Sequence, residues 1–404
     1  MKLARTLSPR RLRLTTAQWR QDLGHLFKDA SQSGPPVRIV NTPTPPPQRG
    51  LRLVVDSVRE ETSEARTIFL RSADPSRPLP QAEAGQFLTF ELPIGGERLR
   101  RSYSLSTGPL DDGPRAITVK RVAGGRASTW LTTALAVGDV LEAIGPASGR
   151  FIYRPTPDDR RERTLVLIGA GSGITPLMAI ARTALVAEPQ TRVALLYGNR
   201  GVDDVIFRAA LDALGAAYAS RLRVCHVLER GAAAAGAVKG KLTAGVIAQQ
   251  LPELLASFGD DARGRLKDVD AFYVCGPPAV MDNARGALLV AGVAKPRIHE
   301  ERFQSLPPAR ESTEPATVLM RRGAVETPVV LSPGETLLEV AWRAGVPVGS
   351  SCTMGGCGAC KVRVLEGELA MPDASCLTPA ELEAGYALAC IARCAGPATV
   401  EVPE

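Results

Sequence analysis

One stretch decides the fold of the carboxyl-terminal part of this 404-residue chain: Ser350-Ser351-Cys352-Thr353-Met354-Gly355-Gly356-Cys357-Gly358-Ala359-Cys360. Its three cysteines are spaced C-x4-C-x2-C, and Cys390 follows after 29 further residues. This is the ligand spacing of plant-type [2Fe–2S] centres, in which two sulfide-bridged irons need four thiolates. The glycines let the loop wrap a cluster and aim backbone N–H groups at its sulfurs, because glycine tolerates positive φ.

A structural zinc site would also use four cysteines. Zinc ligands usually come as two pairs, whereas here three cysteines share one loop and one lies elsewhere. We therefore expect the metal ligands of a [2Fe–2S] cluster to be Cys352, Cys357, Cys360 and Cys390. The other four cysteines lack the dense spacing of a secreted disulfide scaffold, so we expect a cytoplasmic protein.

The net charge of +7 is unevenly distributed. Residues 1–49 carry nine Lys or Arg against two Asp, whereas residues 314–404 carry six basic and eleven acidic residues. An acidic carboxyl-terminal domain beside a basic body suits electrostatic docking of one on the other. Nucleic acid is not an expected partner, because the positive charge lies mainly in one tail. No apolar run approaches the length of a membrane span.

Residues 1–49 read as a basic extension. Trp19, Leu23, Leu26 and Phe27 have the spacing of an amphipathic helix, and a proline-rich linker follows. Such a helix either packs on the body of the same protein or docks on a membrane surface or partner protein.

Three domains follow this extension. Residues 50–157 show period-two alternation with turn residues about every ten positions, which predicts an antiparallel β-barrel. Residues 158–304 alternate strands with helices, which predicts an α/β domain with a parallel sheet. Its expected strands are 165–168, 193–197, 222–227 and 271–274, and its expected helices are 176–187, 204–218, 244–250 and 279–291. Residues 305–313 form a linker, and residues 314–404 form an α+β, β-grasp-like domain around the cysteine loop, with expected helices at 336–344 and after Thr378 and a strand at 361–365.

Two segments have the composition of phosphate-binding sites. The strand at 165–168 runs into a loop with Gly169, Gly171, Gly173 and Thr175, where a pyrophosphate could lie at the start of a helix. The loop is not G-x-G-x-x-G, so a standard Rossmann assignment would be wrong. In the barrel, Gly125-Arg126-Ala127-Ser128-Thr129 forms a second glycine turn before a helix.

A third motif, Arg101-Ser102-Tyr103-Ser104, lies on a barrel strand. Alone it reads as an ordinary surface strand, yet arginine can pair a phosphate, tyrosine can stack on a ring and serine can bond its edge. Together with Cys275-Gly276-Pro277-Pro278 and His299-Glu300-Glu301-Arg302-Phe303, these motifs occur in the order found in the ferredoxin–NADP⁺ reductase superfamily. Over residues 50–404 the chain resembles its reductase–ferredoxin fusions, such as the reductase components of phenylacetyl-CoA epoxidase, ketosteroid 9α-hydroxylase and acyl desaturases.

The resemblance implies site residues. FAD would lie in the barrel, with Arg101 on the pyrophosphate, Tyr103 against the isoalloxazine, Ser104 near flavin N5 and residues 125–129 on the phosphates. Gly169, Gly171, Gly173 and Thr175 would hold the coenzyme phosphates. Cys275 would border the nicotinamide, and Gly276 and Pro277 after it would also belong to the cofactor site. Glu301 would lie near hydride transfer, although Glu300 beside it could serve instead. Phthalate-dioxygenase-type relatives use FMN, so FAD is inferred mainly from the 125–130 segment.

Arg200 follows the second strand of the α/β domain, where a coenzyme 2′-phosphate would lie, and this favours NADPH over NADH. NAD(P)H delivers two electrons at once and the cluster accepts one, so a flavin must convert between them. The expected function is an NAD(P)H-dependent reductase that passes electrons to an oxygenase or desaturase. The alternative is a redox sensor that reports to a regulator through residues 1–49.

Overall fold

The computed structural model describes residues 50–156, 162–231, 236–259, 266–303, 311–372 and 375–404. These residues belong to one compact unit, Pro43–Glu404. The predicted helix and linker within residues 1–49 and the linker residues 304–310 lie outside the described residues.

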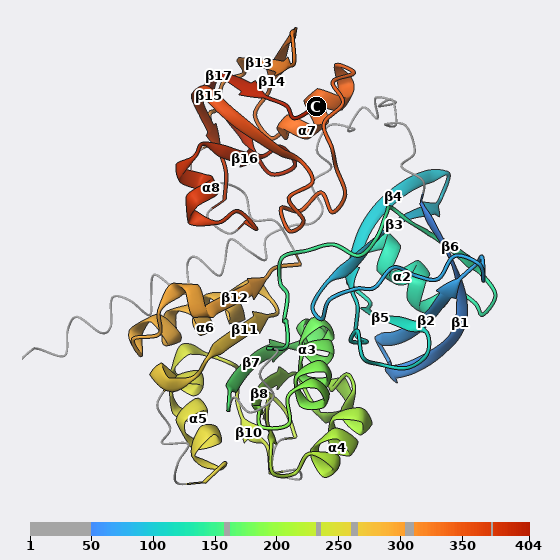
Figure 1. Cartoon of the computed structure of the whole chain (residues 1–404), viewed down its shortest axis with the longest axis vertical. Helices are drawn as coiled ribbons and strands as arrows, with labels where there is room; N and C mark the ends of the chain where they lie inside the picture. The colour runs from blue at the N-terminus through green and yellow to red at the C-terminus, as the bar shows by residue number, and fades with distance from the viewer. Residues whose placement is uncertain (1–49, 157–161, 232–235, 260–265, 304–310, 373–374) are drawn as a thin grey trace, which may run out of the picture. The chain divides into compact units, whose positions relative to one another are not determined.

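The first part of the unit is a curled antiparallel sheet with the strand order β4-β3-β6-β1-β2-β5 (Figure 1). A bridge between Leu105 and Ile117 joins the end of one edge strand to the other edge. Alternation along β1 buries Leu53 and Val55, which confirms the predicted β-barrel. Its elements are β1 (Leu51–Thr62), β2 (Ala65–Ser72), β3 (Phe87–Ile94), β4 (Glu97–Ser104), β5 (Arg115–Lys120), α2 (Arg126–Thr133) and β6 (Val140–Ala143).

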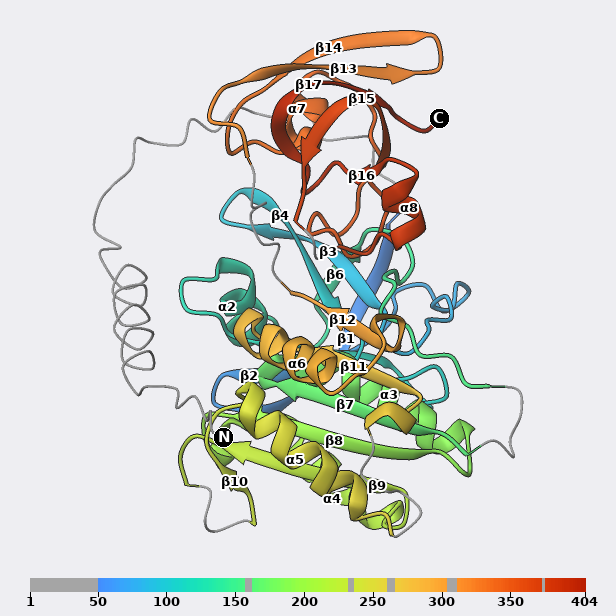
Figure 2. The same cartoon turned by 90° about the vertical axis from the view of Figure 1, so that its left-hand side faces the viewer.

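The second part is a parallel sheet with the strand order β10-β9-β8-β7-β11-β12. Helices cover both faces: α3 and α4 pack into one hydrophobic core, and α5 and α6 into a second core on the opposite face (Figure 2). This confirms the predicted α/β architecture. Its elements are β7 (Thr164–Ala170), α3 (Ile174–Ala187), β8 (Arg192–Asn199), α4 (Arg208–Ala217), β9 (Leu222–Leu228), β10 (Val238–Lys239), α5 (Ala244–Ala256), β11 (Ala271–Cys275), α6 (Pro278–Val290) and β12 (Ile298–Glu301).

Two helix boundaries differ from the prediction by four residues or more, whereas the others agree to within about two residues. Helix α4 begins at Arg208 rather than at residue 204, because Phe207 has a left-handed φ of 63° that interrupts the helix. Helix α5 continues past residue 250 to Ala256 with Pro252 inside it. Its buried face extends through Leu254 and Leu255, so core packing outweighs the hydrogen bond that the proline cannot make.

The third part is a five-stranded mixed sheet with the strand order β14-β13-β17-β15-β16, packed against α7. Both predicted helices are present, and each begins with a capping box, Thr336 with Glu339 and Thr378 with Glu381. Strand β15 extends beyond the predicted residue 365, because it continues to pair with β17 across two register shifts. The elements are β13 (Ala316–Arg322), β14 (Val325–Leu331), α7 (Leu337–Arg343), β15 (Lys361–Ala370), α8 (Pro379–Glu383), β16 (Tyr386–Leu388) and β17 (Arg393–Glu401).

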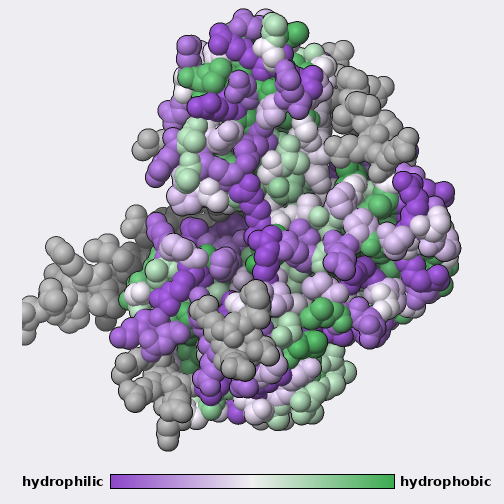
Figure 3. Space-filling view, in the orientation of Figure 1, coloured by the Kyte–Doolittle hydropathy of each residue, from purple (hydrophilic) through white to green (hydrophobic). Residues whose placement is uncertain are grey.

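On the face shown in Figure 3, hydrophilic and hydrophobic residues are interspersed. Some large apolar side chains are exposed, among them Val290 and Val325. Among the described residues, no helix combines the length and the apolar character needed to cross a membrane.

Candidate functional site

The strand order of the parallel sheet places two predicted motifs side by side. From β7 the chain adds β8, β9 and β10 on one side of the sheet and then returns to add β11 and β12 on the other side of β7. The strand order therefore reverses between β7 and β11. Ligands of open α/β sheets bind at the carboxyl ends of strands at such a switch point. Gly169 pairs in register with Cys275, and Cys275 pairs with Glu301 on β12. Residues far apart in the sequence therefore meet at one sheet edge.

The glycine-rich loop fits against the Cys275 segment only because it lacks side chains. A Cβ atom on Gly173 would lie 2.1 Å from the carbonyl oxygen of Cys275 and 2.7 Å from the backbone nitrogen of Gly276. Gly171 has a positive φ of 53°, and its carbonyl accepts a hydrogen bond of 2.9 Å from the Tyr197 hydroxyl. The buried Thr175 hydroxyl donates to the carbonyl of Ser172 at 3.0 Å. The loop thus presents bare backbone at the start of α3, as a pyrophosphate site requires.

The barrel contributes Ser104 to this sheet edge. Its hydroxyl donates a hydrogen bond of 3.0 Å to a carboxylate oxygen of Glu301. Burial raises the pKa of Glu301 to about 8, against a smaller lowering by the Ser104 hydrogen bond. Burial also raises the pKa of the Cys275 thiol well above its ordinary value, and the charge of Glu301 adds to this. The structure therefore brings together the three residues for which a catalytic role was predicted.

The other predicted barrel residues lie around the same strand and the next helix. Arg101 is exposed and donates to the carbonyl of Arg100 at 2.7 Å. The Tyr103 ring packs 6.2 Å from that of Phe90, and burial raises its pKa to about 12. Ser104 and Ser102 line a cavity.

Helix α2 starts as the sequence predicts. Gly125 is its N-cap and makes no side-chain capping bond, and Ala127 and Ser128 are buried in the first turn. Arg126 bonds Glu97 at 2.6 Å, and the Ser128 hydroxyl accepts from the N–H of Val122 at 3.0 Å. Thr129 continues the helix, its N–H donating to the carbonyl of the N-cap at 3.0 Å. The glycine turn leaves this helix start without a side-chain cap, which suits a phosphate ligand.

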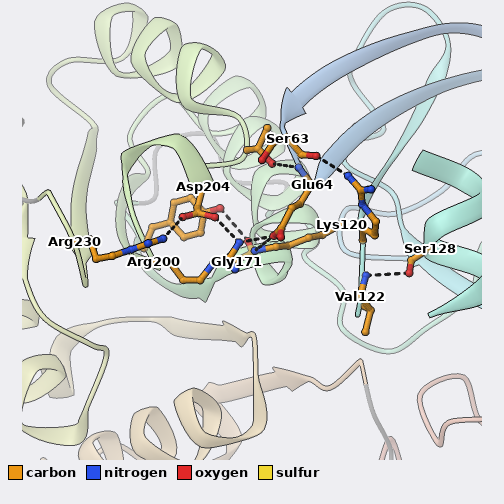
Figure 4. Close-up of polar contacts among 12 residues, drawn as sticks. Ser63, Glu64, Lys120, Val122, Ser128, Gly171, Arg200, Asp204 and Arg230 are labelled. Carbon is orange, nitrogen blue, oxygen red and sulfur yellow. Dashed lines mark hydrogen bonds and ion pairs between the residues drawn. The ribbon is translucent and has the colours of Figure 1, made fainter. Parts of the chain in front are cut away.

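Arg200 does not stand alone at the end of β8. It forms ion pairs with Glu64, in the turn between β1 and β2, and with Asp204 at 2.5 Å (Figure 4). Arg230 lies 3.6 Å from Asp204, and Lys120 lies 3.9 Å from Glu64. Arg200, which we predicted to bind the coenzyme 2′-phosphate, is thus already paired with two carboxylates, one of them from the barrel.

Lys120 is a residue that sequence reasoning missed. It ends β5, and its Nζ atom lies 3.8 Å from where a Cβ on Gly171 would be, so it reaches the glycine-rich loop. Burial lowers its pKa, and repulsion from Arg200 adds to this effect. Its place just before the Gly124-Gly125 turn was the available signal, but which loop it faces depends on the tertiary fold.

The four predicted ligand thiols lie together in the third part of the chain. Hydrogen bonds from the thiols of Cys357 and Cys390 lower the pKa of Cys352, and Cys390 likewise lowers that of Cys360. The N–H of Gly356 also points at the Cys352 sulfur, at 3.3 Å. Across the described residues, no three Cys, His, Asp or Glu side chains converge as around a single ion. Four neighbouring thiols match the donor set of a [2Fe–2S] centre, which needs four thiolates.

A cavity of about 530 Å³ lies between the Ser104–Glu301 pair and the cysteine loop. Its walls include residues from all three parts of the chain, among them Ser104, Glu301, Phe303, Met354, Gly355 and Gly356. The cysteine loop and the Ser104–Glu301 pair therefore face a common space, large enough to hold part of a planar cofactor.

Comparisons with known proteins agree with this arrangement. Three family models match: an oxidoreductase FAD-binding domain over residues 54–153, an oxidoreductase NAD-binding domain over 167–286 and a 2Fe-2S iron-sulfur cluster binding domain over 324–395. The ferredoxin reductase component of 3-ketosteroid-9-alpha-monooxygenase from Rhodococcus rhodochrous is 34% identical, over 85% of this chain and 94% of the relative. A component of the 1,2-phenylacetyl-CoA epoxidase from Escherichia coli is 35% identical, over 84% of this chain and 93% of the relative. The solved structure of phthalate dioxygenase reductase superposes with a TM-score of 0.55 at 26% identity, over 88% of this chain and 98% of that one.

The fold and the site define an NAD(P)H-dependent iron–sulfur flavoprotein, an oxidoreductase of the ferredoxin-reductase type with FAD, NAD(P)H and a [2Fe–2S] cluster as cofactors. The chain belongs to the family of reductase components of oxygenase systems that combine these three domains. The predicted family, fold class and cofactors are thereby confirmed.

Proposed function

We propose that this chain carries electrons from NAD(P)H through FAD and the [2Fe–2S] cluster to an oxygenase or a desaturase. The carrying observation is the shared cavity, in which the Ser104–Glu301 pair and the cysteine loop face each other. Relatives that serve a monooxygenase and an epoxidase, aligned over more than nine-tenths of their length, support an oxygenase acceptor.

Bound FAD would accept two electrons as a hydride and release them singly, which neither coenzyme nor cluster can do alone. In this proposal Arg101 and residues 125–129 hold the FAD phosphates and Tyr103 packs against its ring. Gly169, Gly171, Gly173 and Thr175 hold the coenzyme phosphates, with Lys120 beside them. Cys275, Gly276 and Pro277 lie beside the nicotinamide. The close fit of the glycine-rich loop against this segment requires a glycine at position 173, Gly173.

Ser104 and Glu301 manage the polar environment of the reacting rings. A protonated Glu301 adds no negative charge beside a group that must accept hydride, and its high pKa keeps it protonated near neutral pH. A protonated Glu301 can donate to the Ser104 oxygen, so that the Ser104 hydroxyl, which lies at the same cavity, can donate its one proton to a ring atom. Four thiolates from Cys352, Cys357, Cys360 and Cys390 would anchor the cluster.

The coenzyme subsite centres on Arg200. A 2′-phosphate would compete with Glu64 and Asp204 for this guanidinium, so NADPH binding has to displace at least one carboxylate. We propose that Arg200 favours NADPH and that Glu64 moderates this preference, which leaves NADH usable.

We propose domain boundaries at 50–157, 158–304 and 314–404, supported by the extents of the three matching models. We propose a cytoplasmic location, because none of the eight cysteines, all of them among the described residues, forms a disulfide. Residues 1–49 are proposed to dock the chain on its acceptor or on a membrane surface, on the strength of their charge.

Steady-state turnover tests this function. Purified holoprotein with NADPH or NADH should reduce cytochrome c continuously, with two equivalents reduced per coenzyme oxidised. A redox sensor needs no such turnover, so a protein that is reduced once and then reacts only slowly would contradict the reductase function.

A further inference from the structure

An arginine of the barrel forms an ion pair with the third part of the chain, which contains the cysteine loop. Arg150 follows β6, and both its terminal nitrogens contact the Glu381 carboxylate of α8, at 2.7 and 2.9 Å. This forked geometry is the stronger form of an ion pair, because two parallel hydrogen bonds fix both groups. The pair spans 231 residues of sequence.

Glu381 is itself fixed from three other directions. The backbone N–H and the hydroxyl of Thr378 both donate to it, at 2.8 and 3.1 Å, because Glu381 completes the capping box of α8. Lys361, directly after the ligand Cys360, also forms an ion pair with it. The carboxylate is therefore a rigid anchor tied to the end of the cysteine loop.

Arg150 also reaches the cysteine loop through the backbone. It donates to the carbonyl of Cys376 at 3.2 Å, and the N–H of Cys376 donates to the carbonyl of Gly355 at 3.0 Å. A Cβ on Gly358 would lie 3.8 Å from the Arg150 guanidinium. The same arginine thus lies against the loop and against the anchor beside it.

Among the described residues, the other polar contacts between the barrel and the cysteine loop are weaker. The hydroxyls of Ser351 and Thr89 meet at 3.2 Å, and Arg100 donates to the Ser350 hydroxyl at 3.3 Å. Each is a single bond, slightly longer than the usual range for its type, and neither pairs two charges. The Arg150–Glu381 contact differs from both, because two hydrogen bonds join a positive and a negative group.

We propose that Arg150 and Glu381 are positioning residues that hold the cysteine loop against the flavin cavity, so that electrons cross from FAD to the cluster over a short, fixed distance. The inference rests on the proposed function. Two single-electron transfers per NAD(P)H cross this contact, the proton from the coenzyme is released to solvent, and no bond forms or breaks between the domains. Electron transfer weakens steeply with distance, so a loosened loop slows this step alone.

The test uses the full-length holoprotein and stopped-flow spectroscopy, which follows flavin reduction and cluster reduction separately. Arg150→Gln removes the fork. Glu381→Gln removes the charge yet can keep the helix cap, because glutamine also serves in a capping box. Each variant should slow flavin-to-cluster transfer about tenfold, the scale of a lost charge-assisted pair, and leave flavin reduction unchanged. The double variant should be no slower than either single one, because both remove the same contact.

Arg154→Gln is the matched control. Arg154 also pairs with a glutamate, Glu83, but within the barrel and with 71% of its side chain exposed, against 38% for Arg150. This variant should leave both rates unchanged, and Arg150→Lys should recover part of the lost rate by keeping the charge. Hydrogen exchange of the backbone amides at residues 375–388 should rise in Arg150→Gln and Glu381→Gln but not in Arg154→Gln.

Unchanged flavin-to-cluster transfer in both single variants would overturn the proposal, as would additive losses in the double variant or unchanged hydrogen exchange. A wild-type protein whose cluster is not reduced by NAD(P)H would instead contradict the proposed function, so the two failures are distinguishable.

Discussion

The hydroxyl of Ser104 donates a 3.0 Å hydrogen bond to the carboxylate of Glu301, across 197 residues of sequence. Ser104 ends the barrel strand β4, and Glu301 ends β12 at the edge of the parallel sheet. Each strand thus delivers its last polar side chain to the cavity that the cysteine loop also lines. We propose that flavin and coenzyme chemistry takes place at this contact.

The raised pKa of Glu301 predicts a pH dependence. Below about pH 8 the carboxyl keeps its proton, and above it a negative charge would appear beside the proposed site of hydride transfer. The rate constant of flavin reduction by NAD(P)H should therefore fall as the pH rises through about 8. The folded state holds this proton more tightly than the unfolded chain. As the pH rises from the ordinary pKa of Glu301, 4.5, to about 8, the free energy of unfolding should therefore fall progressively.

Glu301→Gln isolates this effect, since an amide stays neutral at every pH. Stopped-flow reduction of the variant should be nearly independent of pH between 6 and 9, and at pH 7 it should stay close to the wild-type rate. The same variant of the neighbouring Glu300, which pairs with Arg285 at 2.7 Å, should keep the wild-type pH profile. If the pH dependence instead disappears in the Glu300 variant and persists in Glu301→Gln, then Glu300 is the titrating group that controls flavin reduction.

Coenzyme choice should respond in opposite directions to two substitutions. Arg200→Ala should raise the KM for NADPH and leave that for NADH nearly unchanged, because a lost charge-assisted phosphate contact costs on the order of 1.5–3 kcal/mol. Glu64→Gln should lower the KM for NADPH, since it releases Arg200 from a competing carboxylate. Steady-state kinetics with both coenzymes measure this. Equal effects of Arg200→Ala on the two coenzymes would count against a 2′-phosphate role.

Removal of residues 1–49 should separate docking from catalysis. NAD(P)H oxidation with ferricyanide should remain intact, because the three domains lie outside this segment. Transfer to the native acceptor should slow, since the segment carries nine basic residues against two acidic ones. Aggregation or loss of FAD on truncation would show instead that the segment packs on the body of the same protein.

The sequence was sufficient to predict the features that local patterns specify. Alternation of apolar residues predicted the barrel, the alternation of strands and helices predicted the parallel sheet, and the cysteine spacing predicted the thiol cluster. Gly173 was predicted to lie in a pyrophosphate-binding loop, and the structure shows that its lack of a side chain also lets this loop approach the backbone of Cys275.

The contacts between distant segments could not be predicted in this way. Glu64 meets Arg200 across 136 residues, and Arg150 meets Glu381 across 231, because the packing of whole sheets sets both distances. Local rules also failed where packing outweighed them, as at Pro252 inside α5. The proposed roles in coenzyme selectivity and loop positioning rest on these long-range pairs, which only the three-dimensional structure reveals.

The central claim is that electrons pass from NAD(P)H through FAD to a cluster held by four thiolates. Cys357→Ser tests it directly, because it removes one of four anchors and leaves the flavin and coenzyme domains intact. Iron and sulfide assays with visible spectra report the cluster, and stopped-flow follows the flavin. We predict loss of the cluster, retained FAD that NAD(P)H still reduces, continued turnover with ferricyanide and much slower reduction of cytochrome c. Zinc in the wild-type protein, or unchanged cytochrome c reduction after complete cluster loss, would contradict this electron path.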